Sequence, residues 1–128
     1  MDMALRWYGS GLDSVTLRQI RQIPGVKGVI SALHEIPAGD PWEYKQVAEL
    51  KKEIEAAGLK LLGIESINVH EDIKLGVPTR DKLIQNYITS LESVGQADIH
   101  LVCYNFMPVF DKDRSCFSIG RWVKRSGI

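Results

Sequence analysis

Cysteine is scarce in this sequence, since Cys103 and Cys116 are the two that it contains. Two cysteines are too few for a disulfide-stapled scaffold or for a zinc site with four cysteine ligands. An excess of charge of one sign is also missing, because 16 basic residues balance 16 acidic residues. This balance removes any electrostatic argument for a nucleic-acid or membrane-surface partner.

Long apolar runs are missing as well. No run approaches the roughly 18 residues that a membrane-spanning helix needs. Residues 1–8 lack the basic segment, followed by an apolar one, that is typical of a signal peptide. These absences predict a soluble, cytoplasmic protein.

The sequence does contain short apolar, β-branched runs that alternate with segments of helical periodicity. Strands are predicted over residues 3–8, 26–33, 59–65 and 99–104. Helices are predicted between them: one capped by Asp13 or Ser14 and reaching Ile23, one capped by Asp40 with Pro41 in its first turn and reaching Ala57, and one capped by Thr79 and reaching Val94. This alternation predicts an α/β fold with a parallel sheet.

The helical periods also predict which side chains face the sheet. The second helix should bury Val47, Leu50 and Ile54, and the third should turn Leu83, Ile84, Tyr87, Ile88 and Leu91 inward. Residues 66–78 are predicted to be a long loop. Residues 111–128 carry five basic residues against two acidic ones without a clear period, so we divide the chain into a domain over 1–110 and a loosely ordered tail over 111–128.

Length limits the architecture further. A closed barrel of eight strand–helix units takes about 250 residues, and this chain has 128. The chain is therefore either a smaller open α/β domain or a piece of something larger.

Polar and aromatic residues follow each predicted strand, where parallel α/β folds bind their ligands. These residues are Trp7, Tyr8, Gly9, His34, Glu35, Glu65, Asn68, His70, Glu71, Asp72, Tyr104 and Asn105. Their chemistry is typical of a pocket for a polyhydroxylated or carboxylate ligand. His34, Glu65, His70 and Asp72 also have side chains that a manganese-like ion accepts as ligands, although their spacing does not establish a site.

Each of these residues has a structural alternative. Trp7 is equally compatible with core packing, and a histidine in the place of His34 is more often a hydrogen-bonded structural group. Glu65 ends an apolar strand, so it should have a partner or a ligand, because a lone buried carboxylate is costly. Asn105 could form a turn, and Cys103, inside an apolar strand, is expected to be inertly packed.

Several long segments together resemble the N-terminal part of mannonate dehydratase. They are RWYG (6–9), DSVTLRQIRQIPGV (13–26), ALHEIPAG (32–39), ELKKEIEAAGLKL (49–61), IESINVHEDIKLG (64–76), TRDKLIQNYI (79–88) and VCYNFMPVFD (102–111). The resemblance covers about residues 1–111. It implies the first half of a (β/α)8 TIM barrel of the xylose-isomerase-like kind, with four strands and three helices.

The resemblance also implies an activity. This family converts D-mannonate to 2-dehydro-3-deoxy-D-gluconate in hexuronate breakdown, with Mn2+ or Fe2+ as a Lewis acid. The positions implied to bind substrate are Trp7, Gly9, His34, Glu65, Asn68, His70 and Asn105. No residue is implied as the catalytic base, and the family's metal ligands belong to later strands that this chain does not contain.

Residues 112–128 depart from the family's pattern, so we expect a truncated chain that is inactive alone. One alternative is a non-catalytic half-barrel that associates with a second copy through its open sheet edge, and we expect a homo-oligomer. A related sugar-acid isomerase or epimerase is a further alternative.

Overall fold

The computed structural model describes residues 1–106. The strands are β1 (Met3–Arg6), β2 (Val26–Ser31), β3 (Lys60–Glu65) and β4 (Val102–Cys103), and the helices are α1 (Leu17–Arg21), α2 (Tyr44–Ala56), α3 (Glu71–Leu75) and α4 (Arg80–Gln96). All strand pairs are parallel and the sheet order is β1-β2-β3-β4, which confirms the predicted α/β class. The tail predicted over 111–128, together with Cys116, lies outside the described residues.

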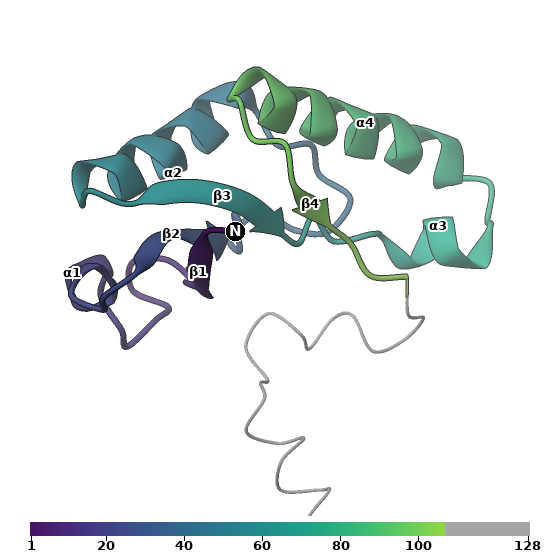
Figure 1. Cartoon of the computed structure of the whole chain (residues 1–128). Helices are drawn as coiled ribbons and strands as arrows, with labels where there is room; N and C mark the ends of the chain where they lie inside the picture. Colours follow the sequence, from purple (N-terminus) through teal and green to yellow (C-terminus); the bar gives the residue numbers. More distant parts are fainter. Residues whose placement is uncertain (107–128) are drawn as a thin grey trace, which may run out of the picture.

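Helices α2 and α4 lie side by side over one face of the sheet (Figure 1). Because side chains alternate along a strand, Val29 and Ile64 point into this helix layer, where both are fully buried. Their neighbours Ile30 and Glu65 point to the opposite face. That second face carries the polar groups at the carboxyl ends of the strands, and it also carries Leu101, which is 49% exposed.

The first helix is shorter than predicted. Thr16, rather than Asp13 or Ser14, is the N-cap of α1, and its hydroxyl accepts a hydrogen bond from the backbone N–H of Gln19. The carboxylate of Asp13 instead accepts from the backbone N–H groups of Tyr8 and Val15. Asp13 therefore fixes the loop between β1 and α1, and the helix starts one turn later.

The second helix begins at Tyr44, with Glu43 as its N-cap, so the predicted start at Asp40 and Pro41 was wrong. The reason lies in Trp42, whose backbone N–H donates a hydrogen bond to the Ser90 hydroxyl at 2.9 Å. The Trp42 carbonyl accepts from the Ser93 hydroxyl at 2.7 Å. Both backbone groups of Trp42 are thus bound to α4 and are not available to a helical turn. The predicted inward residues of α2, which are Val47, Leu50 and Ile54, are buried.

Helix α4 turns only part of the predicted set inward. Leu83 and Tyr87 are half-buried, and Tyr87 packs against the core, as predicted. The fully buried residues are Ser90, Ser93 and Val94, whereas Ile84, Ile88 and Leu91 are 39%, 40% and 38% exposed. Small serine side chains let α4 approach the chain before α2 closely enough for hydrogen bonding, so the buried face continues through the serines rather than through Ile88 and Leu91.

Two further predictions need correction. The segment 66–78 is not a plain loop, because it contains the short helix α3. Cys103 is exposed rather than inertly packed, since its neighbour Val102 takes the position that packs against the core.

Within residues 1–106, no helix has the length and apolar character needed to span a membrane.

Candidate functional site

Four side chains meet at the carboxyl ends of β1, β2 and β3, and we call them the mouth cluster: Arg6, Tyr8, His34 and Glu65. Arg6 Nη1 lies 2.9 Å from Glu65 Oε2, so the two residues form an ion pair that crosses over β2. The Arg6 guanidinium carbon lies 4.8 Å from the centre of the Tyr8 ring, in cation–π geometry. The Tyr8 ring also contacts the His34 ring: their centroids lie 5.6 Å apart, and the angle between the two ring planes is 35°.

Burial and the nearby Arg6 disfavour the protonated form of His34. Burial lowers the pKa of His34 below its usual 6.5, and the positive charge of Arg6 lowers it further. His34 Nε2 is buried and has no hydrogen-bond partner among the described residues. The imidazole is therefore a neutral group at neutral pH, and its Nε2 is free to donate or accept one hydrogen bond.

His34 and Asn68 line one small cavity beside the mouth cluster. Its volume of ≈ 10 Å³ has room for about one water molecule. The loop that follows β2 supplies most of its wall, including Gly39, Asp40 and the buried Trp42. Asn68 is oriented by the Ser66 hydroxyl, which lies 3.1 Å from Asn68 Oδ1. A cavity of this size, lined by an imidazole and an amide, offers hydrogen-bonding partners to one water-sized group such as a hydroxyl.

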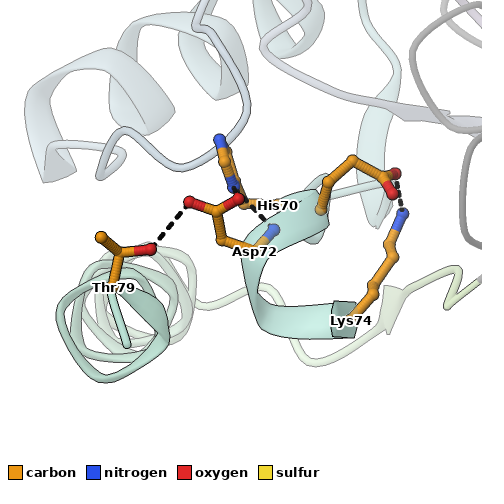
Figure 2. Close-up of polar contacts among 5 residues, drawn as sticks. His70, Asp72, Lys74 and Thr79 are labelled. Atoms are coloured by element: carbon orange, nitrogen blue, oxygen red, sulfur yellow. Dashed lines mark hydrogen bonds and ion pairs between the residues drawn. The ribbon is translucent and has the colours of Figure 1, made fainter. Parts of the chain in front are cut away.

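His70 is the N-cap of α3, and its Nδ1 accepts a hydrogen bond from the Asp72 N–H at 3.1 Å. Accepting at Nδ1 leaves the ring proton of the neutral histidine on Nε2. Figure 2 shows Asp72 between His70 and Thr79, whose hydroxyl donates to Asp72 Oδ2 at 2.7 Å. A second hydrogen-bonded pair in this view joins Lys74 Nζ to Glu71 Oε1 at 3.0 Å.

Gly39 connects the His70 region to the cavity. Its φ of +96° is one that residues with a side chain rarely adopt. A Cβ atom there would lie 2.9 Å from His70 Cδ2 and 2.9 Å from Leu83 Cδ2. The loop can therefore pack against the His70 ring because position 39 has no side chain. The carbonyl of Gly39 also accepts from the amide of Asn86 at 2.9 Å.

The other predicted site residues, which are Trp7, Gly9 and Asn105, are not members of the mouth cluster. Trp7 is 2% exposed and packs in the core, and its indole N–H donates to the Val15 carbonyl at 3.2 Å. Gly9 begins the loop after β1 with a φ of +104°, and within residues 1–106 no atom outside the glycine and its two chain neighbours lies within 4 Å of a Cβ built there. Asn105 lies two residues beyond β4 and is partly exposed. The structure therefore links His34, Glu65, Asn68 and His70 through shared neighbours, and it separates Trp7 from them.

The four residues with metal-compatible side chains do not form a metal centre. Within residues 1–106, no three His, Cys, Asp or Glu side chains gather around a common point. Glu65 is paired with Arg6, while His70 and Asp72 bond to the backbone and to Thr79 around the start of α3. Glu65, His70 and Asp72 therefore already have partners in the folded chain, whereas His34 Nε2 has none among the described residues.

Sequence reasoning did not single out Arg6, although it noticed Glu65. The sequence contains a clue, because Arg6 and Glu65 are residues of opposite charge that each end an otherwise apolar strand. In the structure these two strands lie on either side of β2. Gly39 was placed in a loop, but its contact with His70 could not be predicted, because it depends on how the loop packs against α3 and α4.

Comparison with known proteins places this geometry in a family. Residues 1–120 match the family D-mannonate dehydratase (UxuA). Mannonate dehydratase from Brachyspira hyodysenteriae is 61% identical over 115 residues, which are 90% of this chain and 32% of that protein. Mannonate dehydratase from Thermotoga maritima is 57% identical over 111 residues, covering 87% of this chain and 31% of that protein.

A solved structure agrees with the sequence comparison. The crystal structure of mannonate dehydratase from Streptococcus suis serotype2 superposes with a TM-score of 0.84 at 55% sequence identity. The match covers 87% of this chain and 32% of that one, so the chain spans about a third of the length of the relatives it matches. The family match covers most of the sequence, and the described sheet and helices superpose on a member's fold; the chain belongs to the mannonate dehydratase family.

Proposed function

We propose that this chain forms the N-terminal part of an enzyme that dehydrates D-mannonate to 2-dehydro-3-deoxy-D-gluconate in cytoplasmic hexuronate breakdown. The observation that supports it is the family match over residues 1–120, together with 61% identity to a mannonate dehydratase. The chain spans about a third of such proteins, so the activity belongs to the whole enzyme rather than to this part alone.

The chain's own contribution would be to bind and orient the sugar acid. His34 and Asn68 offer uncharged hydrogen-bonding groups beside a small cavity, and Glu65 offers a carboxylate that accepts hydrogen bonds from hydroxyl groups. We propose substrate-binding roles for these three residues, and supporting roles for the other expected positions, Trp7, Gly9, His70 and Asn105. No described residue is assigned as the base that removes the C2 proton or as the acid that assists departure of the C3 hydroxyl.

The family implies Mn2+ or Fe2+, and residues 1–106 do not fit such an ion, because they bring no three ligand side chains together. We therefore derive no step through the ion. We propose that its ligands come from the part of the enzyme that the relatives contain and this chain does not.

A chimera tests this proposal directly. Residues 1–106 of this chain would replace the matching segment of the Thermotoga maritima relative, and formation of the keto-deoxy acid from D-mannonate would be measured colorimetrically. We expect activity from the chimera and none from the 128-residue chain alone. A folded but inactive chimera would contradict the substrate assignment. Assays with D-fructuronate and D-glucuronate as substrates would then test the alternative hypothesis of a sugar-acid isomerase or epimerase.

One observation favours a second role for the isolated chain. Leu101 on the open sheet face is 49% exposed, and Ile84, Ile88 and Leu91 on α4 are 39%, 40% and 38% exposed. Two copies could cover such apolar surface by associating. Size-exclusion chromatography with light scattering should give a defined dimer if the chain is an assembly module, and heterogeneous aggregates if it is part of a larger enzyme.

A further inference from the structure

Two buried nitrogen atoms in the mouth cluster lack hydrogen-bond partners. Within residues 1–106, the buried side-chain nitrogen or oxygen atoms without a hydrogen-bond partner are Arg6 Nε and His34 Nε2. Native proteins satisfy nearly all such groups, so each exception needs an explanation, and a functional site is one of the usual ones. Here both exceptions fall in the same cluster at the substrate end of the sheet.

Arg6 is connected to every other member of the mouth cluster. Its guanidinium is paired with Glu65 at 2.9 Å and lies over the Tyr8 ring, which in turn contacts His34. The ion pair joins the ends of β1 and β3 across β2, where Arg6 is in register with Ile30. Arg6 thus connects groups from three consecutive strands.

The Arg6–Glu65 pair stabilises the fold only weakly. Both side chains are partly exposed, and pairs of this kind contribute at most about 1 kcal/mol. A stabilising role alone would therefore be a weak reason to place an arginine with an unpaired, buried Nε at this point. A role in the site explains the arrangement better, because the guanidinium orients Glu65 and Tyr8 and acts electrostatically on His34.

We propose that Arg6 is a positioning residue, which fixes Glu65 and Tyr8 and holds His34 as a neutral hydrogen-bonding group for a ligand hydroxyl. The ligand part of this inference rests on the proposed function, whereas the positioning part concerns the chain itself. The reason for a neutral group is chemical. A neutral imidazole can accept a proton or a hydrogen bond from a sugar hydroxyl, whereas an imidazolium can only donate.

The charged groups around His34 determine how this can be tested. Arg6 acts on it from β1, Glu65 lies at the end of β3, and Asp40 lines the same cavity from the loop after β2. Removing the charge of Arg6 should raise the pKa of His34. Removing the charge of Glu65 should lower that pKa further, because the positive charge of Arg6 would no longer be compensated.

The experiment is an NMR titration of the histidine ring signals in the 128-residue chain. The sequence contains three histidines, so single substitutions of His70 and His100 assign the signals. Relative to the unmodified chain, we expect the pKa of His34 to rise in Arg6→Met, to fall in Glu65→Gln and to stay low in Arg6→Lys.

Shifts of the same sign in Arg6→Met and Glu65→Gln, or none in either, would overturn the inference, because packing alone would then control His34. Circular dichroism identifies a variant that fails to fold, and the other variants then decide the result. Failure of this titration leaves the chimera experiment intact, and an inactive chimera leaves the titration intact. The two proposals therefore fail separately.

Discussion

Ser93 and Trp42 are joined by a hydrogen bond of 2.7 Å from the serine hydroxyl to the tryptophan carbonyl, although 51 positions separate them in the sequence. Both residues are buried, at 7% and 4% exposure. Together with the bond from the Trp42 N–H to Ser90, this contact attaches the loop after β2 to α4. That loop forms most of the wall of the candidate cavity.

Replacing Ser93 should therefore cost stability out of proportion to its size. In Ser93→Ala the buried carbonyl of Trp42 loses its partner, which should lower the free energy of unfolding by about 1–3 kcal/mol. Urea denaturation of the chain measures this change. Thr89→Ala is the matched control on the same helix, since the Thr89 hydroxyl bonds to a carbonyl of its own helix, and it should change stability by no more than about 0.5 kcal/mol. Equal effects of the two substitutions would contradict the role of Ser93.

Gly39 should not tolerate a side chain. In Gly39→Ala the new methyl group would meet His70 and Leu83 at 2.9 Å, on a backbone with φ of +96°. Left-handed backbone costs an L-residue roughly 1–2 kcal/mol, and overpacking adds about 1–3 kcal/mol. We expect a loss of at least about 2 kcal/mol in denaturation experiments, with altered NMR shifts of the His70 ring.

Gly95→Ala is the control for that substitution. Position 95 lies in α4, and among the described residues no atom outside the adjoining helix backbone and the two chain neighbours lies within 4 Å of a Cβ built there. Alanine is the better helix former by up to about 1 kcal/mol, so this variant should be as stable as the parent or more stable. A destabilised Gly95→Ala would show that the packing around α4 differs from the one described.

The stability of the chain should fall in mildly acidic solution, in part because of His34. Its pKa in the folded chain is lowered from 6.5 by burial and by Arg6, so the unfolded chain binds more protons there than the folded chain. The stability contribution is complete above pH 6.5, decreases as the pH falls below that value, and levels off below the folded pKa. Denaturation midpoints measured between neutral pH and mild acid should show this decrease.

His34→Gln isolates the contribution of this residue. Glutamine keeps a hydrogen-bonding group but does not titrate in this range, so the slope of stability against pH should flatten. A parent and a His34→Gln variant with the same slope would argue against a depressed pKa.

The two faces of α4 should respond differently to truncation. Val94 is 1% exposed and Ile88 is 40% exposed. Val94→Ala should lower the free energy of unfolding by about 1.5–3 kcal/mol, the range for burying an aliphatic side chain, whereas Ile88→Ala should change it by less than about 1 kcal/mol. The reverse order would show that the side of α4 that carries Ile88, rather than the side that carries Val94, is buried.

The sequence was sufficient to predict four strands, their parallel direction and the buried face of α2, because these depend on local periodicity and on the short connections. The start of α2 was mispredicted, and so was the inward orientation of Ile84, Ile88 and Leu91 on α4. Both depend on the same long-range contact, in which Ser90 and Ser93 bind the backbone of Trp42. Local patterns contain no information on such a contact, and an apolar stripe such as Ile84, Ile88 and Leu91 outweighs two serines in any periodicity analysis.

The candidate site shows the same division. The sequence predicts that the residues after the strands lie at one edge of the sheet, since parallel strands bring their carboxyl ends together, and the structure joins His34 and Glu65 through Tyr8 and Arg6. A partner or a ligand was expected for Glu65, but the identity of Arg6 required knowledge that β1 and β3 both flank β2. Trp7 was equally compatible with core packing and with ligand contact; it packs in the core, and its contact with a ligand stays a prediction.

The strand order has a consequence for any attempt to rebuild an active enzyme from pieces. Among the described residues, β1 and β4 each pair with one neighbour only, so each retains a row of backbone donors and acceptors on its outer side. A complementing polypeptide must satisfy both rows simultaneously, with one parallel strand against β1 and another against β4. A single added hairpin or strand would leave one edge uncovered, so reconstitution should require one continuous folded fragment rather than a short peptide.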